Sequence, residues 1–332
     1  MVLVDQRLSN SIVEEKIAEA ALMAKPVVSV VGIGGAGSNI ISWIKQRGMV
    51  GGQLIALNTD VTHLSTTKAD KRVLIGERTC GGFGSGGYPR KGEAAMRESL
   101  RQVVKELQDS NIIFIVAGLG GGTGTGASYV LADHLRAQGK LVIGVVTLPF
   151  LIERVRMEIA RKGLERLRKA CDTVVAIDNN KLVRVAGNLA FKQALGVANE
   201  LVGIFVKDIT ETIATASLIN IDYVDLRTIM KNRGLAAIGV GYAQGEERVE
   251  RAVKAAMEGQ LLDIGDITMA KGVLIHVSGG EDMTLEDVTK AGEIVMRMLP
   301  QETKIVWGAR VNEGMEGSIH VMVILTGIES AF

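Results

Sequence analysis

Short apolar runs alternate with amphipathic segments along residues 27–187. A run of four to eight apolar residues is typical of a buried strand, whereas apolar residues that recur every three or four positions indicate a helix. The strands predicted in this way are 27–31, 53–57, 72–75, 112–116, 141–146 and 173–177. Helices are predicted at 38–47, 91–108 and 127–137. The alternation predicts an α/β fold, with a Rossmann-like parallel sheet that is covered by helices on both faces.

The pattern changes in the remainder of the chain. A helical stretch at about 188–213 contains no proline, and we expect it to connect two domains. Further on, helices are predicted at 222–232, 246–258 and 284–299, and strands at 235–242, 271–277, 304–309 and 319–326. This different order of elements indicates a smaller α+β domain. The expected organisation is an N-terminal helical extension at 1–26, a first domain at 27–187, a central helix at 188–214 and a second domain at 215–332.

Composition narrows the class of protein. A chain of 332 residues is long enough for about two domains. Its formal net charge of +1 gives no electrostatic reason to expect nucleic acid or an anionic membrane surface as a partner. No apolar stretch reaches the ~18–20 residues of a transmembrane helix, so membrane insertion is not expected. Cys80 and Cys171 lack the spacing of a disulfide framework or a zinc site, which predicts a cytoplasmic protein without a dedicated metal centre.

Residues 118–126 carry the strongest chemical signal, Gly-Leu-Gly-Gly-Gly-Thr-Gly-Thr-Gly. Six glycines in nine residues leave the backbone open to a ligand, at a cost in chain entropy that needs a reason. The loop follows an apolar strand and precedes a helix, so backbone N–H groups and the positive end of a helix dipole meet there. Thr123 and Thr125 add hydroxyl donors. The loop therefore predicts a site for an oxyanion such as a phosphate chain.

Two further glycine-rich segments, 32–37 and 81–89, also follow predicted strands. The first contains Gly32-x-Gly34-x-x-Gly37, which fits the dinucleotide fingerprint, with Asp60 as the candidate acid. An NAD-dependent Rossmann enzyme is thus an alternative, although it leaves the loop at 118–126 unexplained. The absence of a GxxxxGK[ST] motif excludes a P-loop enzyme. Because ligands of parallel sheets bind at the carboxyl ends of the strands, we expect all three loops to converge there.

The segment Asn220-Ile-Asp222-Tyr-Val-Asp225 opens a predicted helix. Asp222 and Asp225 are three positions apart, so they share one face near the helix N-terminus. One interpretation is structural, because the helix dipole favours acids in the first turn. The other is chemical, because a pair of carboxylates can polarise a water molecule or hold a metal ion. These residues alone leave both interpretations open.

The loop Gly120-Gly-Gly-Thr-Gly-Thr-Gly126 resembles the signature of the tubulin/FtsZ superfamily. Other segments agree with that family in order and spacing: Gly34–Asn39, Asn58–Asp60, Thr147–Phe150, Asn220–Asp225 and Ile305–Gly308. The resemblance extends from about Val27 to Ser330, and it is closest to the FtsZ branch, particularly its archaeal members.

This resemblance implies a GTP-binding domain at 27–187 and a C-terminal activation domain at 215–332. It implies a GTPase that converts GTP to GDP and phosphate, and whose copies polymerise head to tail into the filaments of a cell-division ring. The glycine loop of one copy would hold the phosphates, while Asn220, Asp222 and Asp225 of the next would complete the site and polarise the attacking water. GTP or GDP is the expected cofactor, accompanied by Mg²⁺, and Asp60 is a candidate to bind that ion through water.

The nucleotide contacts that the resemblance implies fall in several segments. They are Gly34, Gly35, Ala36, Gly37, Asn39, Asp60, Gly120, Gly121, Gly122, Thr123, Gly124, Thr125, Gly126, Thr147, Glu153, Arg156, Asn179, Leu195 and Asn199. Glu153 matches the ribose-binding acid of the family, which is commonly followed by a glycine and then, four positions after the acid, by an arginine. Here Arg154 replaces the glycine, and a deletion of one residue makes Arg156 the counterpart of that arginine.

The base pocket departs from the commonest FtsZ pattern, because Leu195 and Asn199 stand where an aromatic residue and an acid are frequent. Leucine can cover a base but offers no π-face. Asparagine offers one carbonyl acceptor to the guanine edge instead of two charged oxygens. Tubulins are similar to this chain in using asparagine there. We therefore expect guanine preference to persist, with weaker discrimination against ATP.

The implied partners are further copies of the chain, together with other FtsZ paralogues and membrane-tethering proteins, and the implied location is the division site in the cytoplasm. A second hypothesis is a divergent paralogue that binds nucleotide with little turnover and serves a regulatory or cell-shape role. The altered segment at 153–157 favours that hypothesis, and the retained acids Asp222 and Asp225 argue against it.

Overall fold

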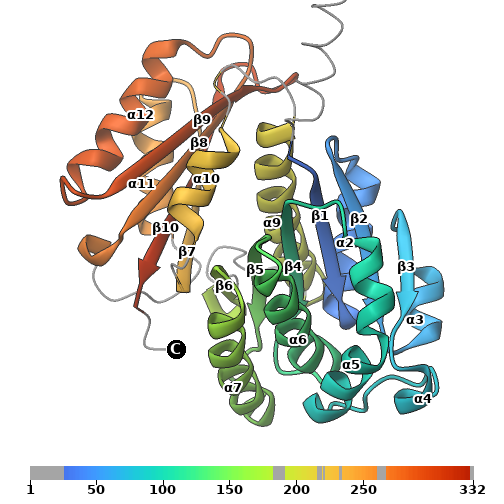
Figure 1. Ribbon diagram of the computed structural model, residues 1–332. Helices are drawn as coiled ribbons and strands as arrows, with labels where there is room; N and C mark the ends of the chain where they lie inside the picture. Colours follow the sequence, from blue (N-terminus) through green and yellow to red (C-terminus); the bar gives the residue numbers. More distant parts are fainter. Residues whose placement is uncertain are drawn as a thin grey trace, which may run out of the picture.

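Among the described residues, ten strands form one continuous sheet in the order β3-β2-β1-β4-β5-β6-β7-β10-β8-β9 (Figure 1). The computed structural model describes residues 26–181, 191–214, 219, 221–231, 234–259 and 267–329. The strands of the N-terminal half are all parallel, as the alternating pattern predicted. They are β1 (Val28–Ile33), β2 (Gly52–Asn58), β3 (Lys71–Leu74), β4 (Ile112–Gly118), β5 (Leu141–Leu148) and β6 (Thr173–Asp178).

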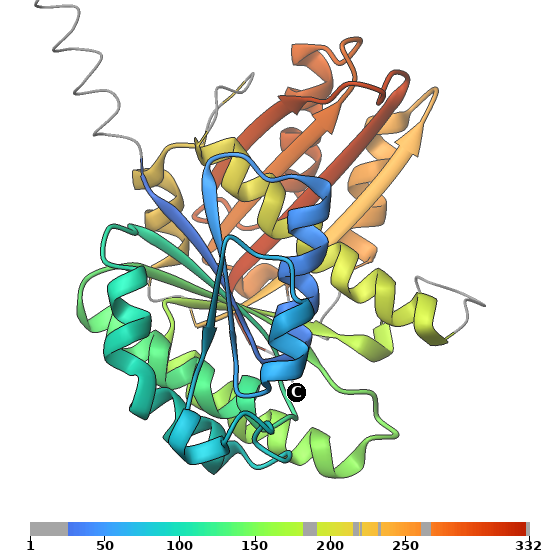
Figure 2. The ribbon, with the colours of Figure 1, turned by 90° about the vertical axis from the view of Figure 1, so that its right-hand side faces the viewer.

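Helices cover both faces of this parallel sheet (Figure 2). On one face lie α5 (Pro89–Glu106), α6 (Thr123–Ala137) and α7 (Arg154–Ala170), which contribute to one apolar core. On the other face lie α2 (Gly34–Arg47), α3 (Val61–Thr66) and the long central helix α9 (Phe191–Ala214), which contribute to a second core. Phe205 of α9 meets Phe114 of β4 edge to face, with ring centroids 6.3 Å apart. A single turn, α4 (Glu77–Cys80), follows β3.

The C-terminal half is built on a mixed sheet. Its strands are β7 (Gly234–Gln244), β8 (Gly272–Gly279), β9 (Lys304–Val311) and β10 (Ser318–Ile328). β10 is antiparallel to β7 and β8, whereas β9 is parallel to β8. Helices α11 (Arg248–Glu258) and α12 (Leu285–Arg297) cover one face and α10 (Tyr223–Met230) the other, and a 3₁₀ turn, Ile267–Met269, precedes β8. The result is the smaller α+β unit that the sequence predicted.

The two halves are joined more closely than the sequence indicated. β7 pairs in parallel with β6 over Thr173–Val175, so the two sheets form one. In Figure 1, α9 stands between the halves. The sequence predicts two units, but the pairing of β6 with β7 depends on contacts between residues about sixty positions apart. The exact domain boundaries stay a prediction.

Two helices begin four residues earlier than the apolar pattern predicted. α2 begins at Gly34 instead of residue 38, and α6 begins at Thr123 instead of residue 127. Glycine and threonine fill both first turns, and they contribute little to an apolar periodicity. The glycine loops therefore pass directly into helices. The N-terminal helical extension expected at 1–26 lies outside the described residues, apart from Pro26.

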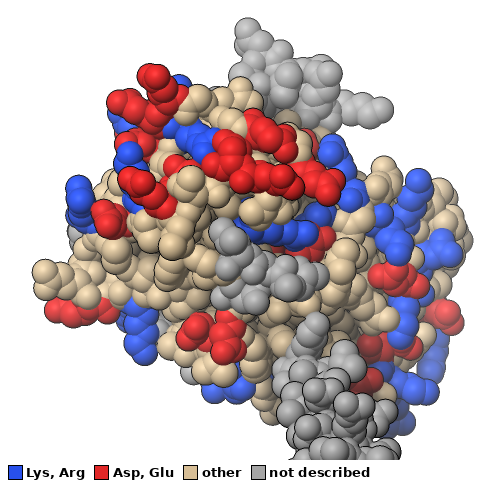
Figure 3. All heavy atoms as spheres, turned by 90° about the horizontal axis from the view of Figure 1, so that it is seen from above, with Lys and Arg blue, Asp and Glu red and all other residues tan. Residues whose placement is uncertain are grey.

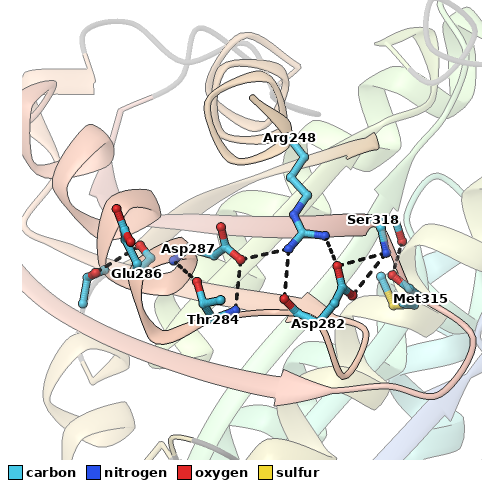
Figure 4. Close-up of polar contacts among 9 residues, drawn as sticks. Arg248, Asp282, Thr284, Glu286, Asp287, Met315 and Ser318 are labelled. Carbon is cyan, nitrogen blue, oxygen red and sulfur yellow. Dashed lines mark hydrogen bonds and ion pairs between the residues drawn. The ribbon is translucent and has the colours of Figure 1, made fainter. Parts of the chain in front are cut away.

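A polar network fixes the loops at one end of the C-terminal half (Figure 4). Arg248 bonds to both Asp282 and Asp287, and Thr284 and Asp287 form a capping box at the start of α12. Viewed from above, Asp and Glu side chains gather across the surface of the C-terminal half (Figure 3). The Arg248 guanidinium holds the pKa of the Asp282 carboxyl below its usual range.

Within the described ranges, no helix combines the length and the apolar character that crossing a bilayer requires.

Candidate functional site

The three glycine-rich loops converge, as predicted, beyond the carboxyl ends of β1 and β4. Together with the end of β5 they enclose a pocket of about 590 Å³. Its lining consists of Ile33, Gly35, Ala36, Ser85, Gly118, Leu119, Gly121, Gly122, Thr123, Gly124, Thr147, Leu148, Pro149, Phe150, Ile152, Glu153, Arg156 and Asn179. The loop at 118–126 (the phosphate loop) forms one wall of the pocket. This wall is almost entirely backbone, because glycine supplies most of it. The pocket therefore presents main-chain N–H groups to a ligand.

Gly122 shows why this loop requires glycine. A β-carbon there would overlap the Ser85 hydroxyl and would lie 2.7 Å from the backbone nitrogen of Tyr88. Gly120 has a φ of +98°, which other residues rarely adopt. The phosphate loop is thus pressed against residues 85–88 on one side and turns sharply on the other.

A chain of hydroxyl groups runs beneath the loop. The Oγ1 atoms of Thr59 and Thr123 are 2.7 Å apart, and the Ser85 Oγ lies 2.9 Å from the Thr123 Oγ1. All three side chains are buried. Thr125, a further predicted ligand contact, accepts the N–H of Gly120 through its Oγ1 at 2.9 Å. Thr125 therefore holds the shape of the loop, while Ser85 and Thr123 reach the pocket wall.

Two helices, α2 and α6, begin at the pocket. Their N-cap residues are Ile33 and Gly122, and neither N-terminus has a side-chain cap or an acidic residue in its first turn. The N–H groups of a first turn have no partner within the helix and must be satisfied from outside. Together with the positive ends of two helix dipoles, these groups make the pocket a binding site for a polyanion.

The opposite wall carries the polar side chains. Arg156 donates from Nη1 to the Glu153 Oε2 at 2.7 Å, and the Glu153 Oε1 accepts the N–H of Phe150 at 3.2 Å. Asn179 is buried, and its Oδ1 has no hydrogen-bond partner among the described residues. An unsatisfied buried acceptor is costly, so a ligand hydroxyl or N–H group fits this position.

Several predicted contacts lie outside the pocket lining. Asn39 is exposed, and its Oδ1 lies 3.1 Å from the Nε2 of His63. Asp60 caps α3 by accepting the N–H of His63 at 3.0 Å. Gly34, Gly37, Gly120 and Gly126 shape the loops and helix starts without lining the pocket. Asn199 is partly exposed on α9, the side chain of Leu195 is outside the described part, and Asn220 is outside the described residues.

Asp222 and Asp225 lie at the N-terminus of α10, away from the pocket. Asp222 is the N-cap, and its Oδ1 accepts the N–H of Val224 at 3.0 Å. Asp225 lies in the first turn of the helix. Both carboxylates are exposed, and neither lines the pocket. The structural interpretation holds for Asp222, and both side chains remain accessible to a second molecule.

Comparison with known proteins identifies the architecture. Residues 27–187 match the GTPase domain of the tubulin/FtsZ family, and residues 234–329 match the C-terminal domain of the FtsZ family. The chain is 44% identical to Cell division protein FtsZ 2 of Methanocaldococcus jannaschii, over 91% of this chain and 80% of that protein. It belongs to the FtsZ branch of the tubulin/FtsZ family. It is also 42% identical to Cell division protein FtsZ 1 of Archaeoglobus fulgidus, over 96% of this chain and 86% of that protein.

The fold agrees with that assignment. The empty FtsZ dimer of M. jannaschii has a TM-score of 0.90 and 42% sequence identity, covering 95% of this chain and 92% of that one. The chain is therefore a GTPase with a GTP/GDP site, and self-polymerisation is a property of its family. An NAD-dependent enzyme is not favoured, because the family match accounts for the glycine loop at 118–126, which that alternative left unexplained.

Ser85 is the polar side chain of the described pocket lining that the sequence did not predict as a contact. The segment 81–89 was predicted to approach the site, but no residue in it was singled out. Ser85 lies 2.9 Å from Thr123 and is buried. A serine with two glycines after it and one before it, in a loop aimed at an anion, is a signal that could have identified it, because its short side chain carries a hydroxyl donor.

Proposed function

We propose that copies of this chain join head to tail and hydrolyse GTP at each junction, within the filaments of a cell-division apparatus. The observation that carries the proposal is the separation of two half-sites: the phosphate pocket lies in the N-terminal half, whereas Asp222 and Asp225 are exposed at α10. Among the described residues, Glu153 is the one carboxylate in the pocket lining, and it is bonded to Arg156. A contact between unlike faces does not close on itself, so it generates filaments.

The pocket supplies binding and orientation. The backbone of residues 121–124 and the start of α2 at Gly35 and Ala36 would hold the phosphates through N–H groups. Glu153 and Asn179 offer acceptors for the hydroxyl and N–H groups of the nucleoside. Arg156 keeps Glu153 oriented and adds positive charge beside the phosphates. These roles fix the γ-phosphate where an incoming water molecule can reach it.

Asp222 and Asp225 of the next copy would supply the missing base. The capping bond at the Oδ1 of Asp222 fixes the direction of that carboxylate, so that its other oxygen can accept a proton from water. Asp225 is one helical turn on and shares the same face. A pair of carboxylates on one face can orient a water molecule for in-line attack. Because the acids come from a neighbour, hydrolysis requires assembly.

Mg²⁺ fits beside the phosphates. In the described part of the chain, no three His, Cys, Asp or Glu side chains gather so as to hold a metal ion. Mg²⁺ bound to nucleotides usually takes most of its ligands from phosphate oxygens and water, with one or two from protein. The hydroxyls of Ser85 and Thr123 and the carboxylate of Asp60 are candidate ligands, directly or through water. When bound, the ion would neutralise charge on the phosphates.

The proposal extends to the recognition of guanine, to further partner proteins and to the location in the cell. Leu195 would cover the guanine and Asn199 would accept its N–H edge, which gives weaker discrimination against ATP than an acid would. The relatives named above are cell-division proteins by name, which supports a role at the division site in the cytoplasm. Other FtsZ paralogues and membrane-tethering proteins are further proposed partners.

Phosphate release by Asp222→Ala tests the proposal. We expect this variant to bind GTP as the unsubstituted chain does and to release no phosphate above background. The matched control is Glu250→Ala, which removes an acid from the first turn of α11, and it should hydrolyse GTP normally. Hydrolysis by Asp222→Ala at the normal rate would refute the proposed catalytic role of the acid.

A further inference from the structure

The carboxylate of Glu211 joins three parts of the molecule. Glu211 lies on α9 and is 1% exposed. Its Oε1 accepts the N–H of Val50, from the segment after α2, at 3.0 Å. Its Oε2 accepts from Lys207, one turn earlier on α9, at 2.7 Å, and also from Nη1 of Arg310 on β9. One buried side chain is thus bonded to the GTPase half, to the central helix and to the C-terminal half.

In the GTPase half, the bond between Glu211 and Val50 connects Glu211 to the helix that begins at the nucleotide pocket. Val50 follows α2, the helix that begins at Gly34 beside the pocket and ends at Arg47. A helix of 14 residues is about 20 Å long, so α2 extends from the pocket to the segment that contains Val50. Ile40, Ile41 and Ile44 are fully buried along it, so α2 is anchored in the core. A displacement of the N-terminus of α2, at the pocket, would therefore change the position of Val50.

In the C-terminal half, the bond between Glu211 and Arg310 connects Glu211 to the strand next to Asp222 and Asp225. Arg310 is next to Ala309, which forms an antiparallel bridge with Ile219, with backbone N–H···O bonds of 3.1 Å in both directions. Ile219 is three residues before Asp222. Ile221 lies close to Gly308, where an added β-carbon would meet its side chain at 2.8 Å. β9 therefore holds both the segment that presents the acids and the arginine that binds Glu211.

We propose that Glu211 is a positioning residue for GTP hydrolysis: it connects the helix that holds the nucleotide to the strand that places Asp222 and Asp225 toward the next copy. The inference rests on the proposed function, because it requires Asp222 and Asp225 to act on the GTP of the next copy. It assigns Glu211 itself no contact with GTP or with the attacking water. An ionised carboxylate makes stronger and more directional bonds than an amide, so the link depends on its charge. Glutamine at this position would keep an acceptor for Val50 and lose the attraction to Lys207 and Arg310.

The chain offers a matched control on the same two helices. Arg47 at the end of α2 pairs with Glu200 of α9 at 3.7 Å, and both side chains are well exposed. That pair connects α2 to α9 and, by the contacts described, does not involve the C-terminal half. Glu200→Gln therefore changes the same residue type on the same helix without touching β9.

The test compares full-length chains carrying Glu211→Gln, Arg310→Gln, both substitutions or Glu200→Gln. GTP affinity, pelleted polymer, unfolding temperature and phosphate release per assembled copy are measured for each. For Glu211→Gln we expect GTP affinity within about twofold of the unsubstituted chain and kcat per assembled copy about tenfold lower. The double variant should be no slower than the slower single variant, because both substitutions break one link. Glu200→Gln should leave kcat unchanged.

The outcomes separate this inference from the proposed function. If Asp222→Ala is inactive while Glu211→Gln assembles and keeps full kcat, the positioning role is wrong and the shared site stands. If Asp222→Ala stays active, the shared site itself is wrong. An equal loss of kcat in Glu200→Gln would also overturn the inference, since the effect would then be a general one on α9. Should Glu211→Gln fail to fold, Arg310→Gln breaks the same link from a partly exposed side chain and must show the same kcat loss.

Discussion

The guanidinium of Arg156 lies 2.7 Å from the carboxylate of Glu153 at the rim of the pocket. Both residues line the pocket, whereas Arg154, which is exposed as Arg156 is, does not line it. This geometry supports Arg156 as the counterpart of the family arginine. The ion pair is partly exposed, so its effect on stability is small and its contribution should be to ligand orientation.

Arg156→Ala should therefore weaken GTP binding by about three- to tenfold, because a cation near the phosphates and the restraint on Glu153 are both lost. Arg154→Ala is the matched control, and it should leave affinity within about twofold. Titration of each variant with a fluorescent GTP analogue measures the difference. A larger loss from Arg154→Ala would reverse the assignment.

Gly122→Ala should destabilise the chain and impair nucleotide binding. The new methyl group would overlap the Ser85 hydroxyl and crowd the backbone at Tyr88, so residues 85–88 must move away from the phosphate loop. Overpacking of this kind costs about 1–3 kcal/mol of unfolding free energy. Thermal or urea unfolding without nucleotide measures the cost.

Gly121→Ala provides the comparison, because an added β-carbon there meets no atom of the described residues within 4 Å, apart from its chain neighbours. Without nucleotide, that variant should unfold within about 0.5 kcal/mol of the unsubstituted chain. Equal destabilisation by the two substitutions would show that the close approach to Ser85 does not constrain the loop.

Asp208→Asn should stabilise the chain at neutral pH. Burial, with Glu211 nearby, raises the pKa of the Asp208 carboxyl to about 6 against the opposing effect of Lys207 and Arg310. A carboxyl with a raised folded-state pKa binds its proton more tightly in the folded state, so stability falls as pH rises from about 4 to 6 and stays lower above that range. The variant removes this loss, so it should gain about 1–3 kcal/mol at pH 7.5.

The gain should largely disappear near pH 4, where Asp208 is protonated in the folded state and about half protonated in the unfolded state. Urea unfolding at the two pH values provides the measurement. A stabilisation of the same size at both pH values would mean that lost charge is not its cause.

The sequence predicted the parts of the site that depend on backbone. A run such as Gly120–Gly126 has few uses other than close approach to a ligand, so its place at the pocket followed from composition and order. The pair Asp222 and Asp225 was also recognisable, because three-residue spacing at a helix start is a local feature. Its two interpretations could not be separated locally, since the distance of the acids from the pocket is a tertiary property.

Side-chain partners from distant segments could not be predicted. The N–H of Gly120 donates to the Oγ1 of Thr125, which gives Thr125 a role in the shape of the loop that the sequence did not predict. Glu211 appears in sequence as an ordinary helical acid, and only its partners from residues 50 and 310 reveal its position between the halves. The pairing of β6 with β7 was missed for the same reason.

The most direct test of a shared hydrolysis site is to mix two inactive variants. Asp222→Ala keeps an intact pocket and lacks the acid, while Gly122→Val keeps the acids and has a blocked phosphate loop. In a random equimolar mixture, about a quarter of the head-to-tail junctions would pair an intact pocket with an intact acid. Phosphate release should therefore return to a substantial fraction of normal in the mixture and stay at background for each variant alone. A mixture that assembles but remains at background would contradict hydrolysis between neighbouring copies.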